Sequence, residues 1–193
     1  MENTLMKDLH LIRNKDEYLE KEIEKVCNDT FFPKSTLELT LDLSNVTSAF
    51  YGLALKNIIE LVDANAANII SEKIFYDLGR IKTQQCKTKY QSLPDDTTAF
   101  AFVVISAIYN ASPEYSFNII KLSPKNTSIK LEGIDRYLRI LTQLKIDQHI
   151  KFPTLIPFMK GIKDELQLDC EIDYEIEINK PENKTSTTYK FTI

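Results

Sequence analysis

The sequence CEIDYEIEI, residues 170–178, decides the fold class of this chain. Its apolar residues alternate with four acidic ones: Glu171, Asp173, Glu175 and Glu177. After a polar loop at 179–184, the alternation returns with Tyr189, Phe191 and Ile193. A period of two is typical of a strand that is buried on one face. The sequence therefore predicts an antiparallel hairpin with one face in the core and an acidic face in solvent.

A hairpin and a helix occur together twice in the C-terminal half. A helix is predicted from Pro153, because apolar residues follow at helical spacing: Leu155, Phe158, Met159, Ile162 and Leu166. Upstream, segments 115–122 and 128–132 predict two strands joined by the turn Ser123–Thr127, and Gly133 opens a further helix. This order predicts an α+β fold, in which an antiparallel sheet built from hairpins has helices packed on one face.

The first half of the chain is predicted to be mostly helical. Helices are expected at 4–27, from a cap at Ser44 or Asn45 to Val62, and after a cap at Asp63. Residues 37–43 alternate strictly and predict a strand. Residues 97–111 are apolar nearly all round, and their length favours a buried central helix over a strand.

Apolar spacing also predicts which faces of two helices point inward. The inward residues of the helix that ends at Val62 are expected to be Val46, Phe50, Leu53, Ile58 and Leu61. Those of the next helix are expected to be Ala66, Ile70, Ile74, Leu78 and Ile81. Gly79 interrupts the second pattern at a cost of about 1 kcal/mol relative to alanine. A close packing contact at Gly79 would offset that cost.

Length predicts the number of domains, and net charge argues against one class of partner. The 193 residues are expected to form a single domain, 1–193, with a helical segment at 1–32 and an α+β core at 37–193. The net charge of −4 argues against nucleic-acid binding, because non-specific affinity for phosphate backbones comes mostly from lysine and arginine. The sequence shows neither a signal peptide nor a stretch suited to a membrane span, so a cytoplasmic protein is expected.

Metal and cofactor sites are not expected. The chain has two histidines and no Cys-x-x-Cys pair, so no zinc-type spacing exists. Its four glycines are isolated and cannot form a phosphate-binding loop. The sequence therefore predicts no metal and no cofactor, and three reduced thiols.

Aromatic residues gather around the central helix and the first hairpin. They include Tyr109, Tyr115, Phe117 and Tyr137, which could line an apolar pocket or belong to the ordinary core. Arg136 and Arg139 lie one helical turn apart, where they could hold a carboxylate or phosphate or be solvated. The predicted ligand-binding residues are Tyr109, Phe117, Arg136, Tyr137 and Arg139.

Two residues are weak candidates for catalysis. Cys86 lies among Lys82, Lys87 and Lys89, an environment that favours a reactive or lipid-modified thiol. His149, in a polar stretch, could act as a general base. Because no recognisable nucleophile motif accompanies either residue, an enzymatic activity is left open and a binding role is favoured.

Two motifs resemble a known scaffold. IFYDLGR, residues 74–80, resembles the helix of 4-vinyl reductase-like domains in which an aromatic residue and two further residues precede Gly-Arg. FMKGIKDEL, residues 158–166, and the hairpin after it resemble the closing pattern of the same domains. Those domains share a fold with haem nitric-oxide-binding domains and with TRAPP Golgi-transport subunits. The resemblance spans about residues 45–193 and implies a ligand-binding or interaction scaffold.

The order of elements is also similar to that of L-2-amino-thiazoline-4-carboxylic acid hydrolase-like proteins. Gly133-Ile134-Asp135 stands where those proteins tend to carry a cysteine. Residues 184–187 lack the Gly-Asp and the cysteine that often precede the last strand in both groups. No haem-ligating histidine of the nitric-oxide binders can be placed.

Three functions are compatible with this sequence. The leading hypothesis is a module that binds a small apolar or carboxylate ligand, or a partner, with the ligand between the central helices and the sheet. The second is a small hydrolase for heterocyclic carboxylates, in which Arg136 or Arg139 holds the substrate and Cys86 or His149 assists. The third is a structural subunit of a complex, and a homodimer is compatible with each.

Overall fold

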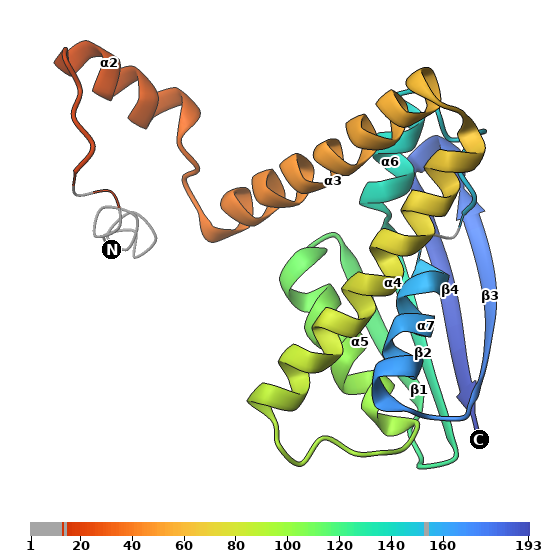
Figure 1. Cartoon of the computed structure of the whole chain (residues 1–193). Helices are drawn as coiled ribbons and strands as arrows, with labels where there is room; N and C mark the ends of the chain where they lie inside the picture. The colour runs from red at the N-terminus through yellow and green to blue at the C-terminus, as the bar shows by residue number, and fades with distance from the viewer. Residues whose placement is uncertain (1–12, 14, 153–154) are drawn as a thin grey trace. The chain divides into compact units, whose positions relative to one another are not determined.

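The computed structural model describes residues 13, 15–152 and 155–193 and divides the chain into two compact units, 1–43 and 44–193 (Figure 1). The first unit contains helix α2 (Lys21–Val26), the π-helical turn η1 (Cys27–Phe31) and the start of helix α3 (Thr36–Leu61). The helix expected at 4–27 lies partly outside the described residues, and its described part is helical only from Lys21. The predicted start of a helix at Pro153 also lies outside them.

The strand predicted at 37–43 is wrong, because these residues are part of helix α3. The Ser35 hydroxyl accepts the backbone N–H of Glu38 at 3.1 Å, as an N-cap residue does. The Glu38 carboxylate in turn accepts the backbone N–H of Lys34. This local capping signal begins a helix that runs on without a break, so the expected cap at Ser44 or Asn45 is wrong as well.

The inward face predicted for α3 is largely wrong. Val46, Phe50, Leu53 and Leu61 are exposed, and the residues buried in their place are Ser44, Ser48, Tyr51, Gly52 and Leu55. Small residues face inward because another helix comes close: a Cβ on Gly52 would lie 2.7 Å from Ile140 Cγ1. Close approach of two helices selects small residues over large apolar ones.

In helix α4 (Ala64–Lys89), too, the buried residues differ from those predicted. Ile70, Ile74 and Ile81 are exposed, whereas the buried residues are Ala67, Asn68, Ser71, Phe75, Gly79 and Thr83. The predicted cap is confirmed, since Asp63 Oδ1 accepts the Ala66 N–H at 2.6 Å. The close contact expected at Gly79 is also confirmed, because a Cβ there would overlap the carbonyl oxygen of Phe158 in helix α7 (Leu155–Leu166).

The fold class is confirmed as α+β. Helix α5 (Thr98–Ala111) leads into strands β1 (Tyr115–Lys121) and β2 (Asn126–Ile134), then helix α6 (Arg136–Gln143) and α7. Strand β3 (Glu171–Asn179), the turn η2 (Lys180–Glu182) and strand β4 (Lys184–Thr192) close the chain. All neighbouring strands are antiparallel, in the order β1-β2-β4-β3. Figure 1 shows α5 and α7 on one side of this sheet.

The register of the last hairpin shows which residues of the sheet face the core. Phe191 lies opposite Ile172, and Tyr189 opposite Tyr174. Phe191 also stacks on Phe100 of α5 at 4.0 Å between ring centroids. The acidic positions of β3 are exposed as predicted, and Lys190 pairs with Glu175 on that face. The alternation of residues 170–191 therefore sets which face of the sheet meets the helices.

None of the helices in the part of the chain that the structure describes is both long and apolar enough to cross a membrane.

Candidate functional site

A cavity of about 50 Å3 lies among helices α4, α5, α6 and α7 and the start of β1. Its apolar walls come from three helices: Phe75 and Leu78 of α4, Val104, Ala107, Ile108 and Ala111 of α5, and Leu155, Phe158 and Met159 of α7. The other lining residues are Lys82, Ser112, Tyr115, Arg136 and Tyr137. The cavity is thus mainly apolar, with a few polar groups at its edge, as ligand sites usually are.

Asp135 anchors the polar edge at the N-terminus of α6. Its Oδ1 accepts the backbone N–H groups of Tyr137 and Leu138 at 2.8 and 3.0 Å, which makes it the N-cap of the helix. Its Oδ2 accepts the Tyr115 hydroxyl at 2.5 Å. Burial raises the pKa of Asp135, because a carboxylate loses its hydration there. Burial and the neighbouring Asp135 charge raise the pKa of Tyr115 far above its usual value.

Arg136 is buried beside the cavity with part of its guanidinium unpaired. Only 8% of the residue is exposed. One Nη donates to the Tyr137 hydroxyl at 2.5 Å, and the other makes a long contact of 3.4 Å with Ser44 Oγ. The Nε atom is buried and has no hydrogen-bond partner. A buried, incompletely paired arginine is costly and rare in folded proteins.

Three aromatic rings support this edge of the cavity. Tyr51, Phe75 and Tyr137 meet edge to face, with ring centroids 4.9 to 5.4 Å apart. The Tyr51 hydroxyl pairs with Ser71 Oγ at 2.7 Å, which fixes its ring between α3 and α4. The guanidinium carbon of Arg136 lies 4.7 Å from the centroid of the Tyr137 ring. These contacts hold Tyr137 and Arg136 in place before any ligand binds.

Of the predicted ligand-binding residues, the structure brings Arg136 and Tyr137 together at the cavity. Arg139 lies one turn further along α6 and makes a two-pronged ion pair with Glu114 at 2.7 and 2.8 Å. A further Nη proton goes to Asn45 Oδ1 at 2.7 Å. The two arginines therefore differ sharply, because Arg139 already holds a carboxylate of the protein and Arg136 holds none.

The other predicted site residues lie elsewhere. Tyr109 is exposed on α5, and Phe117 is partly exposed on the edge strand β1. Cys86 is half-buried, with its Sγ 3.3 Å from Ser106 Oγ of α5. His149 is exposed and contacts Gln148. None of these four lines the cavity, and their assignments stay predictions.

Sequence reasoning named Tyr115 as a residue that could line an apolar pocket, but it did not select Phe75 or Lys82 as site residues. Phe75, Leu78 and Lys82 follow one another at helical spacing of three and four, so a search for polar residues in line with Phe75 would have found Lys82. No pattern in the sequence reports the burial of Tyr115, because that depends on how β1 meets α6.

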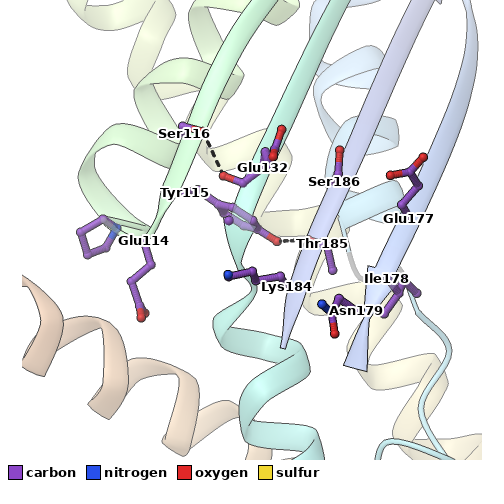
Figure 2. Close-up of a pocket in the computed structure, with 12 residues that line it drawn as sticks. Glu114, Tyr115, Ser116, Glu132, Glu177, Ile178, Asn179, Lys184, Thr185 and Ser186 are labelled. Carbon is purple, nitrogen blue, oxygen red and sulfur yellow. Dashed lines mark hydrogen bonds between the residues drawn. The ribbon is translucent and has the colours of Figure 1, made fainter. Parts of the chain in front are cut away.

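An open, polar groove lies at the end of the sheet, next to the cavity (Figure 2). It measures about 640 Å3 and is lined by parts of all four strands. Tyr115 lines both spaces, and Figure 2 shows its hydroxyl directed at Thr185, with which it pairs at 2.8 Å. Three charged lining residues already have partners: Glu114 binds Arg139, Glu132 binds Lys130 and Lys184 binds Glu182.

The residues that the structure describes contain no group of three His, Cys, Asp or Glu side chains arranged to hold a metal ion.

The cavity is a better candidate for a ligand site than the groove. It is the less open of the two, and Arg136 in its lining has an unpaired Nε.

Comparisons with known proteins bear on the fold. No protein-family model matches the sequence, and no curated protein is significantly similar to it. The phenol-responsive sensory domain of the transcription activator PoxR, whose crystal structure contains phenol, matches with a TM-score of 0.51 and 10% identity, over 74% of this chain and 73% of that one. Subunit 3 of a trafficking protein particle complex from Naegleria fowleri, covalently bound to palmitic acid, matches with a TM-score of 0.49 and 12% identity, over 78% and 95%. The match to the PoxR sensory domain is a likeness of fold over about three quarters of each chain, and to that extent the predicted scaffold resemblance is confirmed.

Proposed function

We propose that this protein is a small-molecule-binding module and that its ligand occupies the cavity among α4, α5, α6 and α7. The observation that carries this proposal is a partly enclosed, mainly apolar space with Arg136, Tyr137 and Tyr115 at one edge. Such a combination is the usual form of a binding site for a small organic molecule. The PoxR sensory domain, which has the same fold, holds phenol in its crystal structure, and this fits a role in ligand binding.

The size of the cavity limits the ligand. A volume of about 50 Å3 corresponds to roughly three to five water molecules at ~10–15 Å3 each. A ligand that enters this closed form therefore has only a few non-hydrogen atoms inside the cavity. A larger ligand would need the walls formed by α5 and α7 to move apart.

The proposal is tested by thermal denaturation with a panel of small apolar and aromatic compounds of two to about seven carbons. A ligand present at about 100 times its Kd adds roughly 2.7 kcal/mol of stability, which raises the Tm of a chain of this length by roughly 5–10 °C. Native mass spectrometry then measures the bound mass.

The variant Ala107→Leu supplies the control, because Ala107 lies in the wall and a larger side chain there fills the space. We expect Ala107→Leu to remain folded, as judged by circular dichroism, and to lose the response to ligand. If no compound binds, or if Ala107→Leu responds like the wild type, the cavity is not the ligand site and the proposal fails.

A further inference from the structure

We infer that the ligand of this cavity carries a carboxylate and that Arg136 is its counter-charge. This inference rests on the proposed function, because it names the chemistry of the molecule that the same cavity would take. It comes from the one feature of the cavity that ordinary packing leaves unexplained, namely a buried guanidinium without an anion.

The charged residues that line the cavity are all positive. Its lining contains two cationic residues, Arg136 and the half-buried Lys82, and no acidic residue. Neither cation makes an ion pair within the part of the chain that the structure describes. The whole chain has a net charge of −4, so this local positive charge runs against its composition. Buried charges in proteins are normally paired, and here the protein does not provide the partner.

Asp135 is the carboxylate next to Arg136 in the chain, but its two oxygens already accept three hydrogen bonds. Oδ1 caps α6 through two backbone N–H groups, and Oδ2 takes the Tyr115 hydroxyl. The Arg136 charge favours the ionised form of Asp135 through space, but no direct hydrogen bond joins them among the described residues. Asp135 therefore lowers the free-energy cost of burying the Arg136 charge, but it does not supply a hydrogen-bond acceptor for Nε.

The free donors of Arg136 fit a carboxylate in particular. The Nε–H and an Nη–H on the same side of a guanidinium form a fork that matches the two oxygens of a carboxylate. The bonds to Ser44 and Tyr137 use two of the five N–H groups, which leaves the Nε–H and two Nη–H groups as donors. The apolar walls of α5 and α7 suit a short hydrocarbon body behind the carboxylate and give nothing to the further oxygens of a phosphate.

Arg139 is a natural internal control. It lies on the same helix, carries the same charge and already holds the Glu114 carboxylate through both Nη atoms. The inference is that an external carboxylate binds the guanidinium of Arg136 as Glu114 binds that of Arg139, although Glu114 is held by the two Nη atoms.

The test is calorimetric titration of the full chain at low ionic strength with propionate, butyrate and benzoate, each against its neutral amide, and with inorganic phosphate. We expect at least one carboxylate to bind about tenfold or more tightly than its amide. Arg136→Gln should remove that preference, Arg136→Lys should retain part of it, and Arg139→Gln should leave it within about twofold of the wild type.

A second readout covers the case in which Arg136→Gln folds poorly. Arg136→Met removes the unpaired charge while keeping a long apolar side chain. It should therefore leave the Tm of the ligand-free protein unchanged or higher, and it should abolish the Tm increase caused by the carboxylate. An arginine that serves only the fold would give a lower Tm.

The outcomes separate the two proposals. If neutral amides bind as tightly as acids, or if Arg136→Gln keeps the preference for acids, the ligand is not a carboxylate held by Arg136, while the binding cavity stands. If phosphate binds as tightly as any carboxylate and depends on Arg136, the carboxylate assignment is also overturned. If acids bind Ala107→Leu as well as they bind the wild type, they bind outside the cavity, and both proposals fail.

Discussion

Gly79 of α4 and Gly161 of α7 lie where the two helices cross. A backbone carbonyl of each helix occupies the position that a Cβ on the glycine of the other helix would need. A Cβ on Gly79 would overlap the Phe158 carbonyl oxygen, and a Cβ on Gly161 would overlap that of Tyr76. Both obstacles are backbone atoms, which cannot rotate away. Tyr76 and Asp164, and Arg80 and Glu165, pair across the same crossing at 2.7 and 3.0 Å. Because Phe75, Leu78, Phe158 and Met159 flank this crossing, it also sets one wall of the cavity.

The crossing predicts that Gly79→Ala and Gly161→Ala each destabilise the protein. Alanine would gain about 1 kcal/mol in helix propensity over glycine, but overpacking against a backbone atom costs typically 1–3 kcal/mol or more. We expect a net loss of roughly 1–2 kcal/mol or more in urea unfolding.

Gly52→Ala serves as the comparison, since its Cβ would meet only the ends of the Ile140 and Leu144 side chains at 2.7 and 2.9 Å. Those side chains can rotate, so Gly52→Ala should cost less than either of the other variants. Equal losses at the three glycines would contradict the role of the backbone contact.

The buried Asp135 predicts an unusual pH dependence of stability. Its pKa is raised by burial above the ordinary 3.8. A carboxyl with a higher pKa in the folded state stabilises the fold fully below its unfolded-state pKa, and this contribution is lost as pH rises through its folded-state pKa. The stability of the wild type minus that of Asp135→Asn should therefore fall as pH rises above about 3.8, measured by urea unfolding at several pH values.

Tyr115→Phe extends this test. The Tyr115 hydroxyl holds the pKa of Asp135 down by donating to the ionised carboxylate. Its removal should raise the Asp135 pKa further and carry the loss of stability to higher pH. If the stability lost on Asp135→Asn instead rises with pH, in the wild type or in the Tyr115→Phe variant, Asp135 is stabilised in its charged form.

The pair between Glu114 and Arg139 predicts a measurable coupling energy. Their side chains are only 18% and 21% exposed, and the geometry is two-pronged. A double-mutant cycle with Glu114→Gln and Arg139→Gln should give about 1 kcal/mol of coupling. The solvent-facing pair of Lys190 and Glu175 should give no measurable coupling. Comparable values for the two pairs would mean that the enclosure of Arg139 adds nothing.

The thiols predict an order of reactivity in the native protein. Cys170 is buried, and burial raises its pKa, which lowers the fraction of reactive thiolate. Cys27 and Cys86 are half-buried. A variant with Cys27→Ser and Cys86→Ser should thus react slowly with an aromatic disulfide reagent until urea is added. Rapid labelling of that variant without urea would show that the Cys170 strand opens readily.

Several features of the fold follow from local sequence. The alternation in 170–178 and 189–193 predicts the last hairpin and its solvent face, and Asp63 predicts the start of α4 through a cap that needs no tertiary contact. Other local signals conflict. Residues 37–43 alternate like a strand, yet the cap at Ser35 and continuity with the following helix make them helical.

The site depends much more on tertiary structure. On α6, apolar periodicity places Arg136 and Arg139 together on the polar side, but the packing of the Tyr51, Phe75 and Tyr137 rings encloses Arg136, while Glu114 is positioned to bind Arg139. On α3 and α4, spacing selects the large apolar residues as inward, whereas close helix approach at Gly52 and Gly79 turns the small residues inward. Neither effect can be predicted from one helix alone, because each depends on what a second helix presents.

The sequence by itself thus determined the last hairpin, the α+β class and the acidic outer face, since these follow from the side-chain period of two in residues 170–178 and 189–193. Only the tertiary structure decided which of two neighbouring arginines would lie beside a cavity without an ion pair. That depends on contacts between segments about ninety residues apart, such as Arg136 with Ser44 and Arg139 with Asn45.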